Sequence, residues 1–276
     1  MSTPSKGQVP GAGEPPLGPG DLTAALGRLG VGSKSVLLVH ASVRSLGRWL
    51  IGGPPAVVLA LEECLGQDGT LVMPTHSADW SDPATWENPP VPVSWWQRIR
   101  DEMPAFRPDL TPSFYMGQVA ECFRHQEGVL RSSHPQVSFA ARGPLAEQIV
   151  GEHPLAYGLG DDSPLGRIYD AAGWVLLIGV DHGVNTSLHL AEYRCSFPGK
   201  RELTQAAPIL VAGERRWVSF PDVAIDSDDF GRLGEAFDAA TGLVRKTTVG
   251  DALWRLMPQR ELVDFAVSWL PVHRLG

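Results

Sequence analysis

The stretch GWVLLIGVDHGVNTSLHLAEYR, residues 173–194, decides the fold. Residues 174–180 form a continuous apolar run of strand length, which is typical of a strand buried on both faces. Residues 181–184 then make a short turn, and either Asn185 or Thr186 can accept a first-turn N–H as the N-cap of a helix over residues 187–194. The sequence therefore predicts a central strand of an α/β sheet that leads directly into a helix.

Three polar side chains share one face of that helix. Thr186, His189 and Glu192 follow one another at i, i+3 spacing, just beyond the carboxyl end of the strand, where open α/β sheets bind their ligands. A carboxylate that accepts from one imidazole nitrogen fixes the tautomer and leaves the other nitrogen as a base near neutral pH. The threonine hydroxyl can donate to a developing oxyanion. The pattern favours proton abstraction, although a His and a Glu three apart also occur on purely structural helices.

Length and charge bound the class of protein. The 276 residues can form one large α/β domain or two small ones. We favour a single domain over residues 21–276, preceded by a disordered tail over residues 1–20, because the tail is built mainly from Pro, Gly, Ser and Ala. The net charge of -8 argues against nucleic acid and anionic membranes and suits a cationic small-molecule partner.

The cysteines and the apolar runs concern the compartment. Cys64, Cys122 and Cys195 have no metal-ligand spacing and form no even disulfide framework, so they fit a reducing environment. The sequence has no signal-peptide h-region and no apolar run of about 18 residues. We therefore expect a cytoplasmic protein without a bound metal.

Polar residues follow two further expected strands. Residues 35–39 lead into His40, Ala41 and Ser42, and residues 69–74 lead into Thr75 and His76. Other elements expected from periodicity and capping are a strand over 137–141, a hairpin over 206–220 that turns at Ala212-Gly213-Glu214, and a strand over 243–248. Helices are expected over 22–29, 56–65, 116–125, 144–150, 165–171, 230–240, 250–257 and 261–270.

The segment Ile51-Gly52-Gly53-Pro54-Pro55 before the helix at 56–65 is a candidate anion site. Glycines let backbone N–H groups approach a phosphate, and the helix dipole lies behind them. Arg44, Arg48 and Lys34 supply nearby charge. The same residues also fit a plain loop, and the chain contains neither GxxxxGK[ST] nor a strand-linked GxGxxG, so a P-loop or Rossmann site is not expected.

Two irregular segments have open interpretations. Residues 75–111 are rich in Pro and Trp without a clear period, which fits either the wall or lid of a cleft or a packed surface insertion. Four aspartates between residues 222 and 229 fit either a solvated loop or a surface that recognises a polyamine.

Several motifs together resemble the aminoglycoside 3-N-acetyltransferase family, in order and across roughly residues 21–270. They are HAS at 40–42, GGPPAVVLAL at 52–61, GTLVMPTH at 69–76, RSSHPQVSFAARG at 131–143, SPLGRIY at 163–169 and GVDHGVNTSLHLAEYR at 179–194. The segments at 82–92 and 94–106 are similar to members from antibiotic-producing actinomycetes. The resemblance implies a three-layer α/β/α sandwich with a central mixed sheet, distinct from the common N-acetyltransferase fold. It also implies acetyl transfer from acetyl-CoA to the 3-amine of a 2-deoxystreptamine antibiotic, hence antibiotic resistance, with no metal.

The same resemblance implies roles for individual residues. His189 is the expected base, Glu192 its orienting carboxylate, and Thr186 lies near the thioester carbonyl. Positions along the cofactor are His40, Ala41, Ser42, Ser45, Gly52, Gly53, Thr75 and His134. Candidates for contact with the acceptor are Asp79, Trp80, Glu121, Asp226 and Asp229. Many relatives read GHDSNT where this chain has DHGVNT, and we assign His182 no role.

Four alternatives remain open from the sequence. Cys195 lies three residues beyond Glu192 and could be the nucleophile of a ping-pong acyltransferase. His40, His76, His182 and His189 could serve a metal-dependent hydrolase, although no HExxH supports it. The protein could also sequester an antibiotic without catalysis, or acylate another primary amine in a biosynthetic pathway. We expect a monomer or homodimer.

Overall fold

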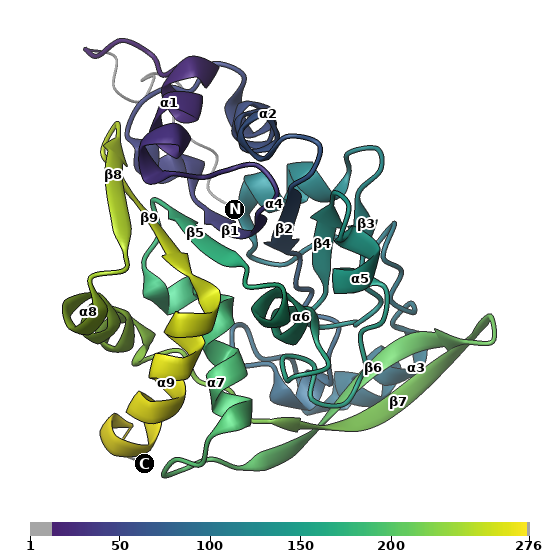
Figure 1. Ribbon diagram of the computed structural model, residues 1–276. Coiled ribbons are helices and arrows are strands. Elements are labelled where there is room, and N and C mark those ends of the chain that lie inside the picture. The colour runs from purple at the N-terminus through teal and green to yellow at the C-terminus, as the bar shows by residue number, and fades with distance from the viewer. Residues whose placement is uncertain (1–12, 275–276) are drawn as a thin grey trace.

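A seven-stranded mixed sheet forms the centre of the computed structural model, which describes residues 13–274 (Figure 1). The strand order is β3-β4-β2-β1-β5-β9-β8. β1 pairs in parallel with β2 and β5, whereas β4 and β9 pair antiparallel to β2 and β5. The strands are β1 (Val36–Ala41), β2 (Thr70–Pro74), β3 (Leu130–Arg131), β4 (Phe139–Arg142), β5 (Trp174–Ile178), β8 (Arg245–Val249) and β9 (Ala252–Pro258). The predicted strand at the start of the key stretch is thus confirmed as a central one.

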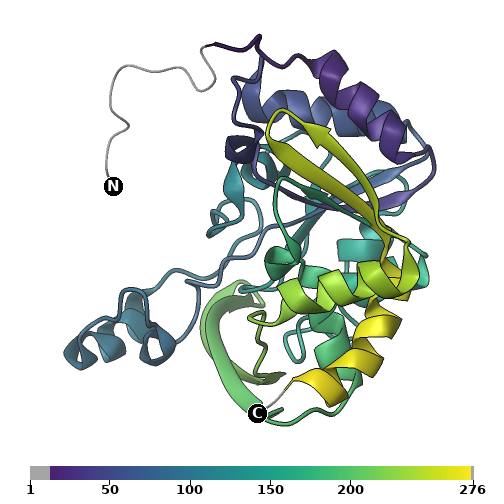
Figure 2. The same cartoon turned by 90° about the vertical axis from the view of Figure 1, so that its left-hand side faces the viewer.

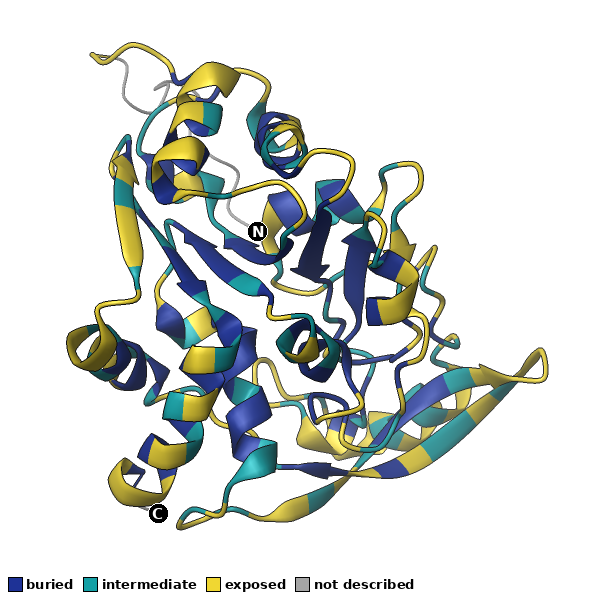
Figure 3. Cartoon of the chain, viewed as in Figure 1, coloured by how far each residue is buried: buried dark blue, intermediate teal, exposed yellow. Residues whose placement is uncertain are grey.

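Helices cover both faces of this sheet. Figure 3 shows the central strands as buried. Successive residues of β1 show why: Leu37 and Val39 join one buried cluster, whereas Val36 and Leu38 join the other. The first cluster includes side chains of α1 (Pro19–Leu29), α2 (Gly53–Leu65) and α4 (Gly117–Arg124). The second includes those of α5 (Ala146–Val150), α6 (Pro164–Asp170), α7 (His189–Arg194), α8 (Phe230–Thr241) and α9 (Gln259–His273). The chain is therefore an α/β/α sandwich with a mixed sheet, as the sequence predicted.

The three parallel strands end at one edge of the sheet. Ala41 pairs with Ile178, and the next N–H, from Ser42, donates to the Ile178 carbonyl at 2.9 Å. β2 ends beside them at Pro74. This edge gathers the polar segments that follow β1, β2 and β5, which is the place where an open α/β sheet binds its ligand.

A long hairpin and a folded arm lie outside the main sheet. β6 (Glu202–Val211) and β7 (Glu214–Val223) form a two-stranded sheet, confirming the predicted hairpin at greater length. The arm carries the 3₁₀ turns η2 (Pro83–Thr85) and η3 (Val93–Trp95) and helix α3 (Trp96–Glu102), and projects from the body beside the hairpin (Figure 2). The two are joined because Phe106 donates its N–H to the Pro208 carbonyl at 2.9 Å and Arg215 donates to the Met103 carbonyl at 2.6 Å.

Two expectations about the ends of the chain need correction. The helix expected over residues 250–257 is strand β9, because Gly250 turns the chain at a φ of 56° and the following residues alternate between buried and half-buried positions in a hairpin with β8. The expected tail over residues 1–20 lies partly outside the described residues. Its described end is ordered: Leu17 is buried and exchanges backbone hydrogen bonds with Trp49 and Ile51, and α1 begins at Pro19.

Candidate functional site

The turn after β5 begins with two side-chain caps. Asp181 accepts the Gly183 N–H at 2.9 Å and starts the 3₁₀ turn η4 (His182–Val184). Asn185 accepts the Ser187 N–H at 3.2 Å and starts η5 (Thr186–Leu188), which runs into α7. Asn185 is therefore the cap that the sequence predicted as one of two choices, and it places Thr186, His189 and Glu192 on successive turns.

His189 and Glu192 form a close pair. The imidazole Nδ1 donates to Glu192 Oε2 at 2.5 Å, and the His189 ring packs 4.8 Å from the Phe230 ring. The glutamate side chain is completely buried, whereas 14% of the His189 side chain is exposed. The pair thus has its acid inside the protein and its imidazole toward the surface, with Nδ1 occupied and Nε2 left for another partner.

Glu192 has two further partners from distant segments. Its Oε1 accepts the Asp226 N–H at 3.0 Å and a hydrogen bond from the Arg274 guanidinium. Three donors thus satisfy a carboxylate that would otherwise be buried without partners. Sequence reasoning missed Arg274, because the contact joins residues 82 positions apart and Arg274 belongs to no recognisable motif.

A cavity of about 760 Å³ lies at the same sheet edge, within the size range of small-molecule sites. Expected cofactor residues that line it are His40, Ala41, Ser42 and Gly53, and Thr186 of the predicted catalytic set also lines it. Its other walls include Arg44, Arg48, Trp49, Tyr115 and Gly117, of which the aromatic pair was not predicted. Burial and the charge of nearby His189 lower the pKa of His40 to about 3, so His40 is a neutral wall of the cavity.

The segment before α2, predicted as a candidate anion site, presents fewer backbone amides than the sequence suggested. Gly52 adopts a φ of 82° and Gly53 a φ of 57°, which favours glycine at both positions. However, the Gly53 N–H donates to the Leu50 carbonyl at 3.1 Å, and Pro54 and Pro55 have no N–H. The first turn of α2 therefore offers its dipole but no free amide to an anion, and the cations nearby are Arg44 and Arg48.

Four expected cofactor residues lie outside this cavity lining: Gly52, described above, and Ser45, Thr75 and His134. His134 is fully buried, its Nδ1 accepts the N–H groups of Gln136 and Val137 at 3.1 Å, and its Nε2 faces the Leu155 carbonyl. The Thr75 hydroxyl pairs with Ser138 at 3.3 Å. The Ser45 hydroxyl donates to the Ser42 carbonyl at 2.6 Å and lies against Gly179. These side chains hold loops together.

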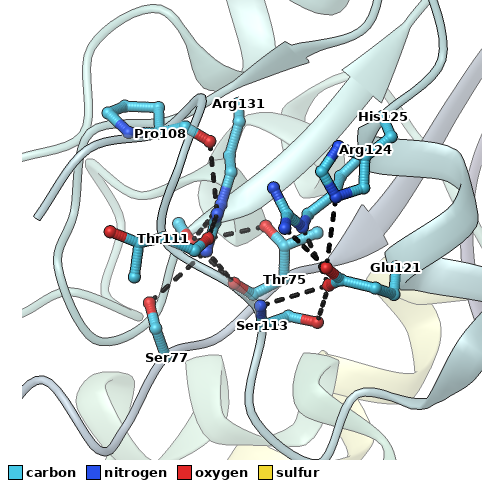
Figure 4. Close-up of polar contacts among 10 residues, drawn as sticks. Thr75, Ser77, Pro108, Thr111, Ser113, Glu121, Arg124, His125 and Arg131 are labelled. Atoms are coloured by element: carbon cyan, nitrogen blue, oxygen red, sulfur yellow. Dashed lines mark hydrogen bonds and ion pairs between the residues drawn. The ribbon is translucent and has the colours of Figure 1, made fainter.

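The motif around His134 also contains an anchor that the sequence did not reveal. Arg131 is largely buried, and burial lowers its pKa to about 10. Its guanidinium donates to the carbonyl oxygens of Thr75, Pro108 and Thr111 and to the hydroxyls of Ser77 and Ser138, as Figure 4 shows in part. Arg131 thereby ties both ends of the 75–111 segment to the sheet.

The expected acceptor-contacting residues divide into bound and free side chains. Glu121 is occupied by Arg124 and Ser113, which hold its pKa at about 2 against the effect of burial (Figure 4). Asp229 is occupied by Arg274. The Trp80 indole donates to the Pro104 carbonyl at 3.0 Å. Asp226 remains exposed, and burial raises the pKa of Asp79. Asp226 and Asp79 are therefore the candidates that remain available.

The structure also shows the surroundings of the residues on which the ping-pong and metal-dependent alternatives depend. Burial raises the pKa of the Cys195 thiol, which packs against the second apolar cluster. Cys195 does not line the cavity that Thr186 lines. His182 is buried against Gly234, away from the cavity lining. Within residues 13–274, no three His, Cys, Asp or Glu side chains gather as a metal site, and no helix is long and apolar enough to cross a bilayer.

A small-molecule cavity lies at the carboxyl edge of the α/β sheet, and the His189–Glu192 pair follows its wall residue Thr186 on the next helix, although His189 itself does not line the cavity. Such an arrangement is typical of an enzyme site. The family model described as aminoglycoside 3-N-acetyltransferase matches residues 38–271. The chain belongs to this family of acyltransferases.

Similar proteins agree in sequence and in fold. The aminoglycoside N(3')-acetyltransferase-like protein YokD of Bacillus subtilis (strain 168) is 42% identical over 249 residues, 90% of each chain. Its crystal structure superposes with a TM-score of 0.90 at 40% identity and covers 94% of this chain and 95% of that one. A structure of AAC-IIIb with CoASH has a TM-score of 0.80, 29% identity and coverage of 91% and 95%. AAC-VIa bound to sisomicin has a TM-score of 0.83, 31% identity and coverage of 95% and 100%.

Proposed function

We propose that this protein transfers the acetyl group of acetyl-CoA to the 3-amine of a 2-deoxystreptamine antibiotic, with His189 as general base. The observation that carries the proposal is the 2.5 Å bond from His189 to the buried Glu192, next to a cavity lined by Thr186. The CoASH and sisomicin complexes of similar proteins support the two proposed ligands.

The chemistry follows from the pair. Primary amines are largely protonated at neutral pH, so the acceptor must lose a proton before or during attack. His189 Nε2 takes that proton, while Glu192 holds Nδ1–H and balances the imidazolium. The amine nitrogen bonds to the acetyl carbon, the C–S bond breaks, and the CoA sulfur leaves readily because thiol pKa values are about 8.5. Thr186 is the proposed donor to the oxyanion.

The cavity favours one orientation of the cofactor. Because the first turn of α2 has no free amide, Arg44 and Arg48 are the groups that balance the phosphates. The exposed rings of Trp49 and Tyr115 offer flat apolar surface to the adenine. The thioester then extends toward Thr186.

The acceptor and the biological role follow from charge. The net charge of -8 and the exposed carboxylate of Asp226, which accepts only the Asp228 N–H within the described part of the chain, suit a polycationic acceptor. Acetylation removes one positive charge from the antibiotic, so the proposed role is resistance. We place the reaction in the cytoplasm, which is consistent with the free thiols of Cys64, Cys122 and Cys195.

A thiol-release assay tests the proposal. Acetyl-CoA is incubated with a panel of 2-deoxystreptamine antibiotics and other primary amines, and the acetylated position is read by NMR. We expect CoA release with the antibiotics and loss of turnover in His189→Ala. The matched control His125→Ala, whose imidazole is exposed just after α4, should keep normal turnover. Undiminished turnover in His189→Ala, or a preference for unrelated amines, contradicts the proposal.

A further inference from the structure

Arg274, the residue after α9, reaches back into the site. Its side chain is only 8% exposed. The guanidinium binds both carboxylate oxygens of Asp229, at 2.8 and 2.5 Å, and donates to the Asp226 carbonyl at 2.8 Å. A further hydrogen bond goes to Glu192 Oε1. One cation thus joins the orienting carboxylate to the acidic loop beside it.

Aromatic rings enclose this cation. The guanidinium carbon lies 4.9 Å from the Phe197 ring centroid and 5.7 Å from that of Phe230. The Phe230 ring also packs against the His189 ring, with 4.8 Å between the two ring centroids. Because water is displaced from these contacts, the charges act on one another more strongly than they would at the surface.

We propose that Arg274 is a positioning residue that sets the basicity of His189 by sharing Glu192 with it. The inference rests on the proposed function, in which His189 is the base. The two oxygens of Glu192 have different side-chain partners: Oε1 accepts from the Arg274 guanidinium and Oε2 accepts from His189 Nδ1. Arg274 draws off part of the carboxylate charge and fixes the carboxylate plane, so the imidazolium is stabilised less and the free base persists at lower pH.

The other charged groups around His189 do not replace this effect. Asp226 and Asp229 on the loop before α8 are acidic. Burial lowers the pKa values of His40 in β1 and His76 after β2, so they add no positive charge near neutral pH. Among the described groups bonded to the pair, Arg274 supplies the permanent cation.

Removing the Arg274 cation should shift the pKa of His189 in one direction. In Arg274→Gln, Glu192 keeps its negative charge but no longer faces the guanidinium. Its attraction for the protonated imidazole of His189 is then stronger, so that form gains stability. The pKa of His189 rises by about one unit or more. The acidic limb of the kcat/KM profile moves to higher pH by the same amount, because the base must be neutral to act.

The first experiment measures the pKa of the His189 imidazole, a readout that does not depend on turnover. Proteins with isotope-labelled histidine are titrated by NMR, with the His189 signal assigned by its absence in His189→Gln, and kcat/KM is followed against pH. Arg274→Lys keeps the charge and should hold the pKa within about half a unit while kcat falls about tenfold, because the fork geometry is lost. The matched control is Arg260→Gln on α9, whose guanidinium binds the Tyr169 and Asp170 carbonyls away from the pair.

The outcomes separate this inference from the proposed function. An upward shift in Arg274→Gln, absent in Arg260→Gln, supports it; no shift or a downward shift overturns it. If Arg274→Gln does not fold, Arg274→Lys decides, because an upward pKa shift despite the retained charge refutes the sharing of Glu192. If wild-type protein releases no CoA thiol while the NMR shift is present, the proposed function fails and the electrostatic role of Arg274 stands.

Discussion

Replacing Glu192 with Gln changes one charge in the site with little change of shape. The wild-type carboxylate is fully buried and accepts from three donors: His189 Nδ1 at 2.5 Å, the Asp226 N–H at 3.0 Å, and the Arg274 guanidinium. A glutamine amide brings an NH2 group that itself needs an acceptor. Whichever way the amide turns, this NH2 faces either the guanidinium or the imidazole.

The magnitude follows from these contacts. If the NH2 faces His189, Nδ1 becomes an acceptor and the ring proton moves to Nε2, which then cannot take a proton from the amine. If it faces Arg274, the bond to His189 loses its charge. A hydrogen bond to a charged group is worth about 2 to 3 kcal/mol, so kcat/KM should fall roughly 30- to 160-fold. The unfolding free energy should fall by about 3 kcal/mol or less, since Asp229 still neutralises Arg274.

The assay compares kcat/KM for CoA release with urea unfolding curves of the same variant. The matched control is Glu62→Gln, which removes a half-buried carboxylate paired with Arg142 far along α2. The control should lose some stability and keep its turnover. A value of kcat/KM for Glu192→Gln within threefold of wild type would refute the assignment of Glu192 as the group that orients the base.

Four further outcomes follow from the structure. Gly234→Ala should lower the melting temperature by several degrees, since its Cβ would overlap the buried His182 ring, and an unchanged melt contradicts this. Arg44→Ala should raise the KM for acetyl-CoA about tenfold with kcat nearly constant, and an unchanged KM removes Arg44 from the phosphate site. Cys195→Ala should keep kcat within about twofold and show no acetyl-enzyme by mass spectrometry, whereas lost turnover would revive the ping-pong route. Burial lowers the pKa of His153 to about 3, so the unfolded chain takes up a proton first as the pH falls below about 6.5. Stability should therefore decline from about pH 6.5 toward pH 3, by about 1.4 kcal/mol per unit for this group, and equal urea midpoints at pH 7 and pH 5 would contradict it.

The sequence predicted the centre of the fold well because the signals there are local. The apolar run of β5, the cap at Asn185 and the i, i+3 spacing of His189 and Glu192 all lie within a few residues of one another. Local periodicity could not separate strand from helix over residues 250–257, since an apolar run of that length suits both. Residues 252–258 form a strand because they pair with β5 and β8. A short stretch of sequence does not reveal pairing with a distant strand such as β5.

The rest of the site depends on contacts between distant segments. Arg274 reaches Glu192 across 82 positions, and Arg131 reaches Pro108 across 23. A single arginine near the C-terminus carries no pattern that distinguishes it from a solvated one. The same limit applies to Glu121, which the sequence offered as an acceptor ligand and the structure holds against Arg124 and Ser113.

The histidines show most directly why residue type alone does not assign a role. His134 and His189 each follow a recognisable motif, and each has one nitrogen in a short-range hydrogen bond. At His134 both nitrogens face backbone groups, and burial lowers the pKa to about 4, so the ring serves as a fixed neutral brace. At His189 the bonded partner is a carboxylate, which stabilises the positive ring, and the second nitrogen is not held by backbone. A base needs both features together, and here they arise where α7, the 226–229 loop and Arg274 meet after β5.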